Sequence, residues 1–154
     1  EATAGLLGNS VMALVREPGL ADAIAARTAS IGALVEEAAR HDPSVQNTRR
    51  FVAEPTTVAG TRLEAGDAVL LVMAAANRDP RLNAQPDRFM PGRNDRRMLG
   101  FGHGPHNCPG QALACALAAA GVEALLARGL DLPALRAQGW HYSPSANARI
   151  PVFH

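Results

Sequence analysis

The sequence predicts a mainly α-helical chain with small β-sheets. Residues 1–16 place apolar side chains at helical spacing, and residues 111–128 form an apolar, alanine-rich run. Between these two stretches lie short segments that read as strands around turn residues. The 154 residues, 47% hydrophobic and 19% charged, are enough for one globular core.

The first third of the chain predicts three helices. Residues 1–16 form the first, which ends at Glu17-Pro18-Gly19. Its apolar face consists of Leu6, Leu7, Val11, Leu14 and Val15. A short helical piece follows over 20–25 and a longer helix over 29–41, which Asp42-Pro43 stops.

The rest of the chain predicts strands, one short helix and one long helix. Residues 45–52 read as a strand, and 56–62 and 67–73 as a hairpin about a turn at 64–67. A short helix over 74–80 closes at a proline, and residues 83–94 form a loop. We expect 112–128 to be a buried helix capped by Gly129, and 140–153 to be a terminal hairpin.

Bulk properties exclude several classes of protein. The net charge of +1 gives no reason to expect nucleic acid as a partner. Cys108 and Cys115, the only cysteines, lie too far apart along one helix for easy bridging, and reduced thiols indicate a cytoplasmic protein. No stretch reaches the roughly 18 apolar residues of a membrane span, so we expect no membrane contact.

Residues 101–110 concentrate glycine and proline around one cysteine. The pattern predicts a tight loop that delivers the thiol of Cys108 to the start of the following helix. A helix N-terminus favours a thiolate over a thiol, and a thiolate is a good ligand for iron. The alternative is a glycine-rich turn with a buried structural cysteine.

The spacing Phe-Gly-x-Gly-x-His-x-Cys-x-Gly resembles the haem-ligand loop of the cytochrome P450 family. Glu37-x-x-Arg40, Asn77-Arg78-Asp79-Pro80 and Pro86-x-x-Phe89 also occur in that family's order. The resemblance implies a P450 fold of the bacterial soluble type. It covers only the C-terminal part, starting within the long central helix. The chain also opens directly into a helical pattern without Met, so we expect residues 1–154 to be the C-terminal segment of a single haem domain.

The resemblance assigns a haem site. Cys108 would be the thiolate ligand of haem b, with Phe101 packed beside the sulfur in a loop that includes Gly102 and Gly110. His106 and Arg50 would hold the haem propionates, with Arg49 as the second choice for the arginine. The alternative is that Arg50 faces water.

A second implied cluster is structural. Glu37 and Arg40 face the same side of a helix, and in the family such a pair locks the core to the loop ahead of the ligand. Arg88 is the candidate third member. The alternative is an ordinary surface ion pair.

The start of the chain departs from the family pattern. Glu1 aligns with the acid of an acid–threonine pair that helps deliver protons to dioxygen, but Ala2 stands where the threonine is usual. Thr3, the next residue, points about 100° away around a helix. Either a substrate hydroxyl or water replaces the threonine, or oxygen activation is impaired; Glu1 could also be a frayed terminal charge. Ala2, Val45, Ala146 and Asn147 are expected to contact substrate.

The implied function is a haem-thiolate monooxygenase of bacterial secondary metabolism, which activates dioxygen to hydroxylate or otherwise oxidise a small or carrier-bound organic molecule. A ferredoxin or flavodoxin would donate electrons, since no flavin-binding or iron–sulfur motif occurs here. The basic cluster Arg93, Arg96 and Arg97 is either its docking surface or a solvated face.

Two alternatives come from other classes. One is a catalytically silent homologue that acts as a partner or activator of another enzyme. The other is a zinc protein that uses His103, His106 and Cys108, with a fourth ligand from His41 or His141.

Overall fold

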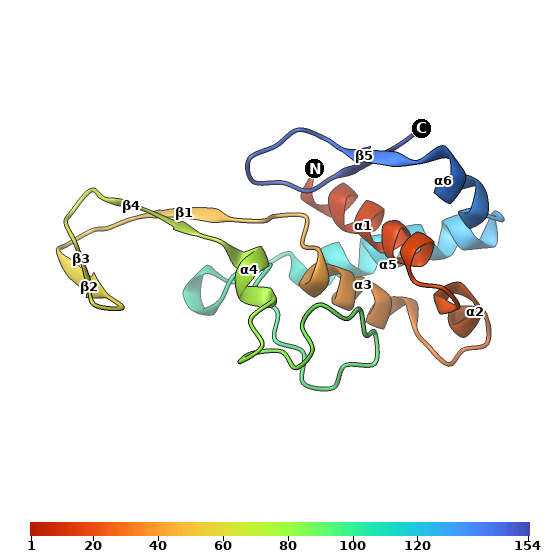
Figure 1. Ribbon diagram of the computed structural model, residues 1–154, viewed down its shortest axis with the longest axis horizontal. Helices are drawn as coiled ribbons and strands as arrows, with labels where there is room; N and C mark the ends of the chain where they lie inside the picture. Colours follow the sequence, from red (N-terminus) through yellow and green to blue (C-terminus); the bar gives the residue numbers. More distant parts are fainter.

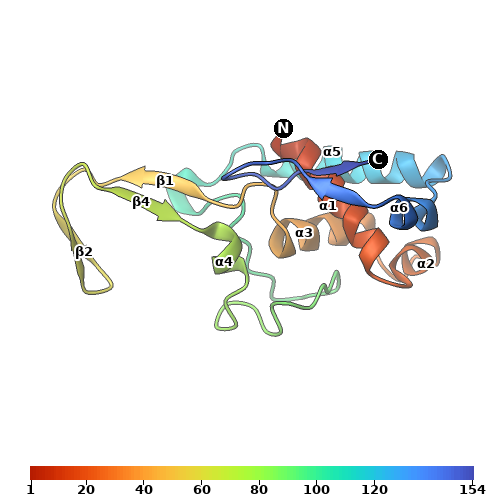
Figure 2. The same cartoon turned by 45° about the horizontal axis from the view of Figure 1, so that its top comes forward.

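The computed structural model describes residues 1–154. It consists of a helical body and a β-arm, residues 48–71, that projects from one end of the body (Figures 1 and 2). The expected mainly helical architecture with small sheets is confirmed. The helices are α1 (Ala2–Arg16), α2 (Leu20–Ala25), α3 (Ile31–His41), α4 (Met73–Asn77), α5 (Gln111–Ala127) and α6 (Leu132–Gln138), with one short 3₁₀ turn, η1 (Gly104–His106).

The core of the body lies where α1, α3 and α5 pack against one another. Two clusters of buried side chains fill the contacts between these helices. One is centred on Leu14, Leu34 and Val122, and the other on Leu6 and Val35. Full burial of each such aliphatic side chain is worth about 1.5–3 kcal/mol, so the three helices form a fixed frame for the segments between them.

Local signals define the helix ends. At the start of α3 the Ser30 hydroxyl accepts a hydrogen bond from the Ala33 N–H at 3.1 Å. Beyond α5, Gly129 adopts φ +76°, and the N–H groups of Gly129 and Leu130 bond back to Leu126 and Leu125. The predicted glycine cap is therefore confirmed. Helix α6 was missed, although Asp131 accepts from the Ala134 N–H in the manner of an N-cap, with proline in the first turn.

The strands form three two-stranded antiparallel sheets. They are β1 (Thr48–Phe51) with β4 (Ala68–Leu71), β2 (Thr56–Val58) with β3 (Thr61–Leu63), and β5 (Trp140–Tyr142) with β6 (Pro151–Phe153). The predicted terminal hairpin is confirmed, but the predicted pairing of 56–62 with 67–73 is wrong. Ala59 and Gly60 both adopt positive φ, so a tight turn divides the first of these segments, and the second pairs with β1.

The β5–β6 hairpin lies across the start of α1, and its loop reaches the segment that leads into β1 (Figure 2). The main chains of residues 44–46 and 147–149 are joined by two hydrogen bonds, Gln46 N–H to Asn147 O at 2.8 Å and Arg149 N–H to Ser44 O at 2.9 Å. This contact fixes the chain between α3 and β1.

Helix α5 is less buried than its composition predicts. Only Ala118 and Val122 are buried, while Leu113 and Leu117 are 65% and 55% exposed. The prediction of a buried helix is therefore wrong for most of its length. No individual helix meets the length and hydropathy of a membrane span; α5 and α6 meet them only as a pair bent by 101°.

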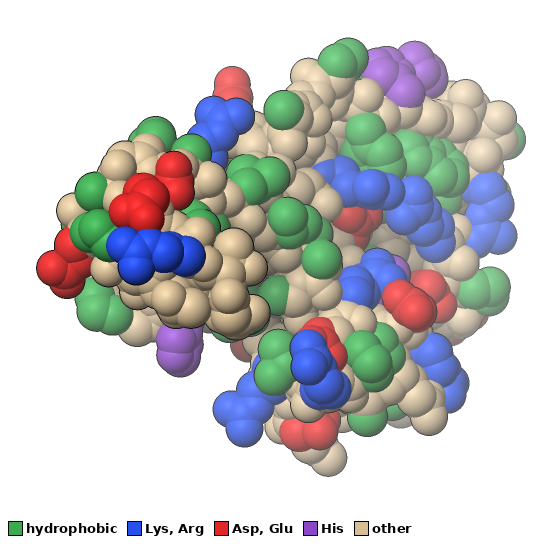
Figure 3. Space-filling model, turned by 60° about the vertical axis from the view of Figure 1, so that its left-hand side comes forward, with side chains coloured by type: hydrophobic (Ala, Val, Ile, Leu, Met, Phe, Trp, Pro, Cys, Tyr) green, Lys and Arg blue, Asp and Glu red, His purple; other side chains and the backbone are tan.

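The β-arm carries apolar and charged side chains side by side on its surface (Figure 3). Phe51 and Leu70 are 72% and 52% exposed, and Arg62 and Glu64 form an ion pair near the tip.

Candidate functional site

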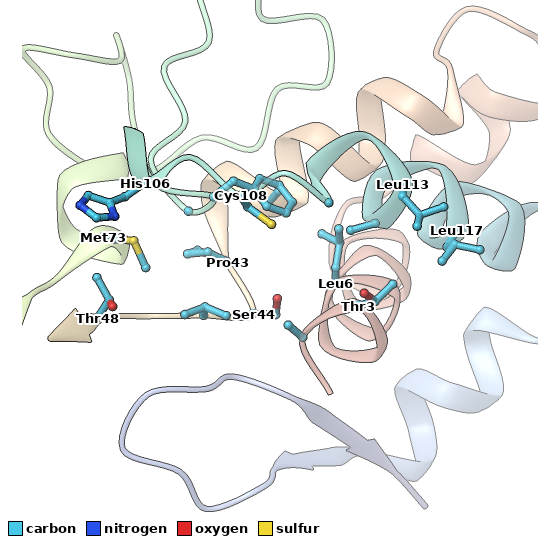
Figure 4. Close-up of a pocket in the computed structure, with 18 of the residues that line it drawn as sticks. Thr3, Leu6, Pro43, Ser44, Thr48, Met73, His106, Cys108, Leu113 and Leu117 are labelled. Carbon is cyan, nitrogen blue, oxygen red and sulfur yellow. The ribbon is translucent and has the colours of Figure 1, made fainter. Parts of the chain in front are cut away.

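A cavity of about 440 Å³ lies between α1, the segment from α3 to β1, and the loop that leads into α5 (Figure 4). Its wall includes Cys108 and is more than half hydrophobic, with ten such residues among nineteen. Side chains from the starts of α1 and α5, from the segment after α3 and from β1 therefore meet around the cavity that contains the Cys108 sulfur.

The loop before α5 is a set of tight main-chain turns. The Gly102 N–H bonds to Leu99 O at 2.8 Å, and the Cys108 N–H bonds to Phe101 O at 2.7 Å. Gly102 adopts φ +83°, and a Cβ there would lie 2.6 Å from the His106 carbonyl oxygen, so only glycine fits. These turns place Cys108 next to the N-terminus of α5, where helix N–H groups create positive potential.

The two cysteines have different surroundings. Cys108 lies on the cavity wall with Phe101 and Gly110, and a Cβ on Gly110 would be 3.8 Å from the sulfur. Cys115 packs instead against the core cluster around Leu6. Burial, with a smaller contribution from the negative charge of Glu36, raises the pKa of the Cys115 thiol. Both cysteines are free thiols.

One end of the cavity is polar. Because side chains alternate along β1, Thr48 and Arg50 line the cavity whereas Arg49 points elsewhere. The Arg50 guanidinium donates to the Thr48 hydroxyl at 3.1 Å and to the Arg49 carbonyl at 2.8 Å. His106 lies at the same end, near Thr48 and Met73 (Figure 4).

The opposite end of the cavity is formed by α1 and α5. Ala2 and Thr3 both line it, and Figure 4 places Thr3 beside Leu6 and Leu117. Consecutive residues of a helix project about 100° apart, yet the cavity is wide enough that both Ala2 and Thr3 line it. Glu1 does not line it.

Of the expected substrate contacts, Val45 lines the cavity, but Ala146 and Asn147 do not. Their main-chain oxygens instead accept hydrogen bonds from the Asn47 side chain at 2.9 Å and the Gln46 N–H at 2.8 Å. The hairpin loop thus braces the cavity wall from outside.

The zinc alternative has no geometric support. His103 does not line the cavity that contains Cys108 and His106, and no three His, Cys, Asp or Glu side chains are grouped so as to hold a metal ion.

Glu37 and Arg40 form a fully buried ion pair on α3. The Arg40 guanidinium donates to the Glu37 carboxylate at 2.7 and 3.0 Å. Its remaining N–H groups donate to the carbonyl oxygens of Asn77, Pro86 and Arg88 at 3.2, 2.9 and 3.1 Å. This one side chain therefore connects α3 to the end of α4 and to the loop that follows, so the pair is not the surface ion pair of the alternative.

The third cation of this cluster is not Arg88, whose guanidinium points outward to Gln85 at 2.8 Å. Arg96 supplies it, with Nε 3.1 Å from the Glu37 carboxylate, and Arg93 Nε lies 3.5 Å from the same group. Proline and glycine at 91 and 92 turn the chain back toward α3, which spacing along the sequence does not reveal. Arg93 and Arg96 are consequently turned inward, so the prediction of an exposed three-arginine cluster is wrong; only Arg97 is exposed.

The cluster keeps Glu37 ionised. Burial alone would raise the pKa of this carboxyl, but hydrogen bonds from Arg40, from the Met90 N–H at 3.0 Å and from Arg96 outweigh that effect and lower it.

Comparisons with known proteins agree on one family. The profile described as "Cytochrome P450" matches residues 31–128. The Biotin biosynthesis cytochrome P450 of Bacillus subtilis is 35% identical over 94% of this chain and 36% of its own length. Cytochrome P450 monooxygenase PikC of Streptomyces venezuelae is 40% identical over 86% of this chain and 32% of its own length. The chain therefore spans about a third of the length of the curated relatives it matches.

Solved structures agree with the sequence matches. P450BioI in complex with an acyl carrier protein ligated to hexadec-9Z-enoic acid superposes with a TM-score of 0.87 at 32% identity, covering 99% of this chain and 40% of that one. CYP164A2 of Mycobacterium smegmatis with bound econazole superposes with a TM-score of 0.88 at 38% identity, covering 99% of this chain and 38% of that one.

Proposed function

The chain belongs to the cytochrome P450 family, and from that premise we propose that it forms the C-terminal part of a haem-thiolate monooxygenase. The observation that carries the proposal is the position of Cys108. Its sulfur lies on the wall of the cavity, at the N-terminus of α5, between a polar and an apolar end.

The residues present fit haem b. The macrocycle is apolar with two carboxylates on one edge, and the cavity has the same asymmetry: Arg50 and His106 lie at one end, and Leu113 and Leu117 at the other. The cavity wall holds a single thiol, and no three His, Cys, Asp or Glu side chains are grouped to hold a metal ion. This suits an iron that would take one thiolate from the protein and its other ligands from the macrocycle. Cys108 would ligate the iron, while Arg50 and His106 would hold the propionates.

When bound, haem with a thiolate ligand supplies the chemistry of dioxygen activation. In the net reaction one oxygen atom enters the substrate and the other leaves as water, with two electrons and two protons taken up. The protein's residues hold the ligand sulfur, the propionates and the substrate, and they exclude water from the apolar end.

Replacement of Arg50 by leucine is expected to increase the rate of haem loss roughly tenfold, because one charged hydrogen bond to a carboxylate is removed. Haem transfer from the full-length protein to an excess of an apo-globin measures this rate. Arg49→Leu is the matched control, since Arg49 lies outside the cavity wall. Equal rates for the two variants would contradict the assignment of Arg50.

Thr3 is the only hydroxyl that α1 contributes to the cavity wall. With Ala2 at the usual threonine position, we propose that Thr3 Oγ1, or a substrate hydroxyl, relays the protons that the reaction consumes. Glu1 is the acid of that relay by sequence position.

Thr3→Val keeps the shape of the side chain but removes the hydroxyl group that would relay a proton. Product formed per dioxygen consumed is then expected to fall about tenfold, with hydrogen peroxide rising in its place. Parallel assays of product, peroxide and dioxygen measure this coupling. Thr48→Val, at the opposite end of the cavity, should retain coupling; an unchanged yield in Thr3→Val would assign the relay to the substrate hydroxyl.

For the whole protein we propose a small organic substrate of bacterial secondary metabolism, free or bound to a carrier. The support is that relatives include a biotin-biosynthesis P450, PikC and a structure in complex with an acyl carrier protein. We further propose a ferredoxin or flavodoxin as electron donor and a cytoplasmic location. The alternative is a catalytically silent homologue, which is favoured by Ala2 at the usual threonine position.

Isotopically labelled dioxygen tests the function. The full-length protein, supplied with a ferredoxin, its reductase and a set of free and carrier-bound acyl compounds, should transfer one labelled atom to product. Haem binding without label transfer to any compound would favour the silent homologue.

A further inference from the structure

We propose that Asn77, at the C-terminal end of α4, is a positioning residue for the thiolate ligand: its side chain holds the start of the loop that carries Cys108. This inference rests on the proposed function, because it concerns the same sulfur. Asn77 does not line the cavity, and none of its hydrogen bonds goes to Cys108, Arg50 or His106.

The side chain of Asn77 makes one hydrogen bond, and that bond is to the loop. Asn77 is fully buried, and its Oδ1 accepts from the Leu99 N–H at 2.7 Å. Its Nδ2 has no partner in the structure. A buried NH₂ group without a hydrogen-bond partner is destabilising. The stabilising contribution of this side chain therefore comes from its carbonyl oxygen, which binds the Leu99 N–H.

Asn77 is itself held in place from two sides. Its main-chain oxygen accepts from Arg40 Nη1 at 3.2 Å and from Asn83 Nδ2 at 3.1 Å. Both donors are fully buried. The position of Asn77, and with it that of Leu99, is therefore fixed by Arg40, which is paired with Glu37, and by Asn83.

The connection from Leu99 to the sulfur is short and continuous. The Leu99 carbonyl accepts from the Gly102 N–H at 2.8 Å, and the Phe101 carbonyl accepts from the Cys108 N–H at 2.7 Å. Between them, Gly100 is packed so closely that a Cβ would lie 3.1 Å from both the Ala39 oxygen and the Pro43 Cβ. A displacement of Leu99 would therefore be transmitted to the turn that sets the sulfur position.

Asn83 provides a matched control. It is also fully buried, and its side chain accepts from the Arg97 N–H and donates to the Arg97 carbonyl, both at 2.9 Å. It also donates to the Asn77 carbonyl at 3.1 Å, but it makes no bond to Leu99, and Arg40 holds the same carbonyl without it. Loss of Asn83 should destabilise the segment but change the ligand much less than loss of Asn77.

Hydrogen exchange tests the contact without reference to haem chemistry. In the full-length wild-type protein the Leu99 amide should exchange at least about tenfold more slowly than the Met98 amide, for which the structure gives no partner. In Asn77→Ala this protection should be lost, whereas Asn77→Asp, which keeps an acceptor oxygen, should restore it. A wild-type Leu99 amide as fast as that of Met98 would overturn the proposal without any variant.

The spectrum of the reduced carbon monoxide complex tests the consequence for the sulfur. Asn77→Ala should convert a substantial fraction of the red-shifted band into the unshifted band of a thiol or displaced ligand, and Asn77→Asp should reverse most of this loss. Asn83→Ala should reduce the red-shifted band much less than Asn77→Ala, because the Asn77–Leu99 bond and the bond from Arg40 to the Asn77 carbonyl remain.

The outcomes separate this inference from the proposed function. A wild-type protein that binds no haem overturns the proposed function. A wild-type red-shifted band that survives in Asn77→Ala, or that Asn83→Ala reduces equally, overturns only the positioning role.

Discussion

Replacement of Cys108 by serine is expected to abolish the proposed thiolate ligation and with it the proposed monooxygenase activity. No other thiol lies on the cavity wall that contains Cys108, where the only other sulfur is the thioether of Met73. A serine hydroxyl is a far weaker ligand for iron than a thiolate. The absorption spectrum and haem content of the purified full-length variant measure the loss. The fold should survive, because Cys108 is only partly buried.

Cys115→Ser is the matched control for this experiment. It removes the other thiol of the chain, which packs on the core cluster around Leu6, seven residues along the same segment. This variant should keep wild-type haem absorption, with at most a modest loss of stability. If Cys108→Ser retained the spectrum of the wild type, or Cys115→Ser lost it, the ligand assignment would be wrong.

Replacement of Arg40 by leucine is expected to destabilise the fold by about 3–5 kcal/mol, because it leaves the buried Glu37 carboxylate without its main partner. Three carbonyl oxygens, from Asn77, Pro86 and Arg88, would lose a donor as well. Arg40→Lys should not restore the stability, since one ammonium group cannot make the five hydrogen bonds of the planar Arg40 guanidinium. Denaturant unfolding of the full-length variants measures the change.

The exposed pair Arg62–Glu64 provides the control for Arg40. These side chains are 73% and 59% exposed, so Arg62→Leu should change the free energy of unfolding by less than about 1 kcal/mol. An Arg40→Leu variant as stable as Arg62→Leu would contradict the structural role of the buried pair.

The pH dependence of stability follows from the same cluster. Because folding lowers the pKa of Glu37, its contribution is present above the ordinary value of 4.5 and is lost as the pH falls through the lower folded value. Stability should therefore fall less steeply on acidification in Glu37→Gln than in the wild type. If the free energy of unfolding fell equally steeply with pH in Glu37→Gln and in the wild type, Glu37 would not be held ionised in the folded state.

The sequence predicted those helix ends and turns that depend on neighbouring residues in the chain. The bounds of α2 and the ends of α1, α3 and α5 follow from turn residues and caps next to them in sequence. The loop of residues 101–110 could be predicted because Gly102 needs both positive φ and close approach to the His106 oxygen.

The errors fall where distant segments choose their partners. Several arginines lie between residues 78 and 97, and only the path of the chain decides that Arg96 and Arg93, not Arg88, turn toward Glu37. The same holds for β4, which pairs with β1 across an intervening hairpin. Apart from its place in a family motif, nothing in the sequence indicated a role for Asn77. Its role depends on the hydrogen bond to the Leu99 N–H, 22 residues away, which only the folded structure shows.

The carbon monoxide difference spectrum of the reduced, full-length protein tests the central claim most directly. Thiolate ligation by Cys108 predicts the strongly red-shifted band that gives the cytochrome P450 family its name. Haem binding with an unshifted band would mean that the sulfur is protonated or displaced, and would contradict the claim.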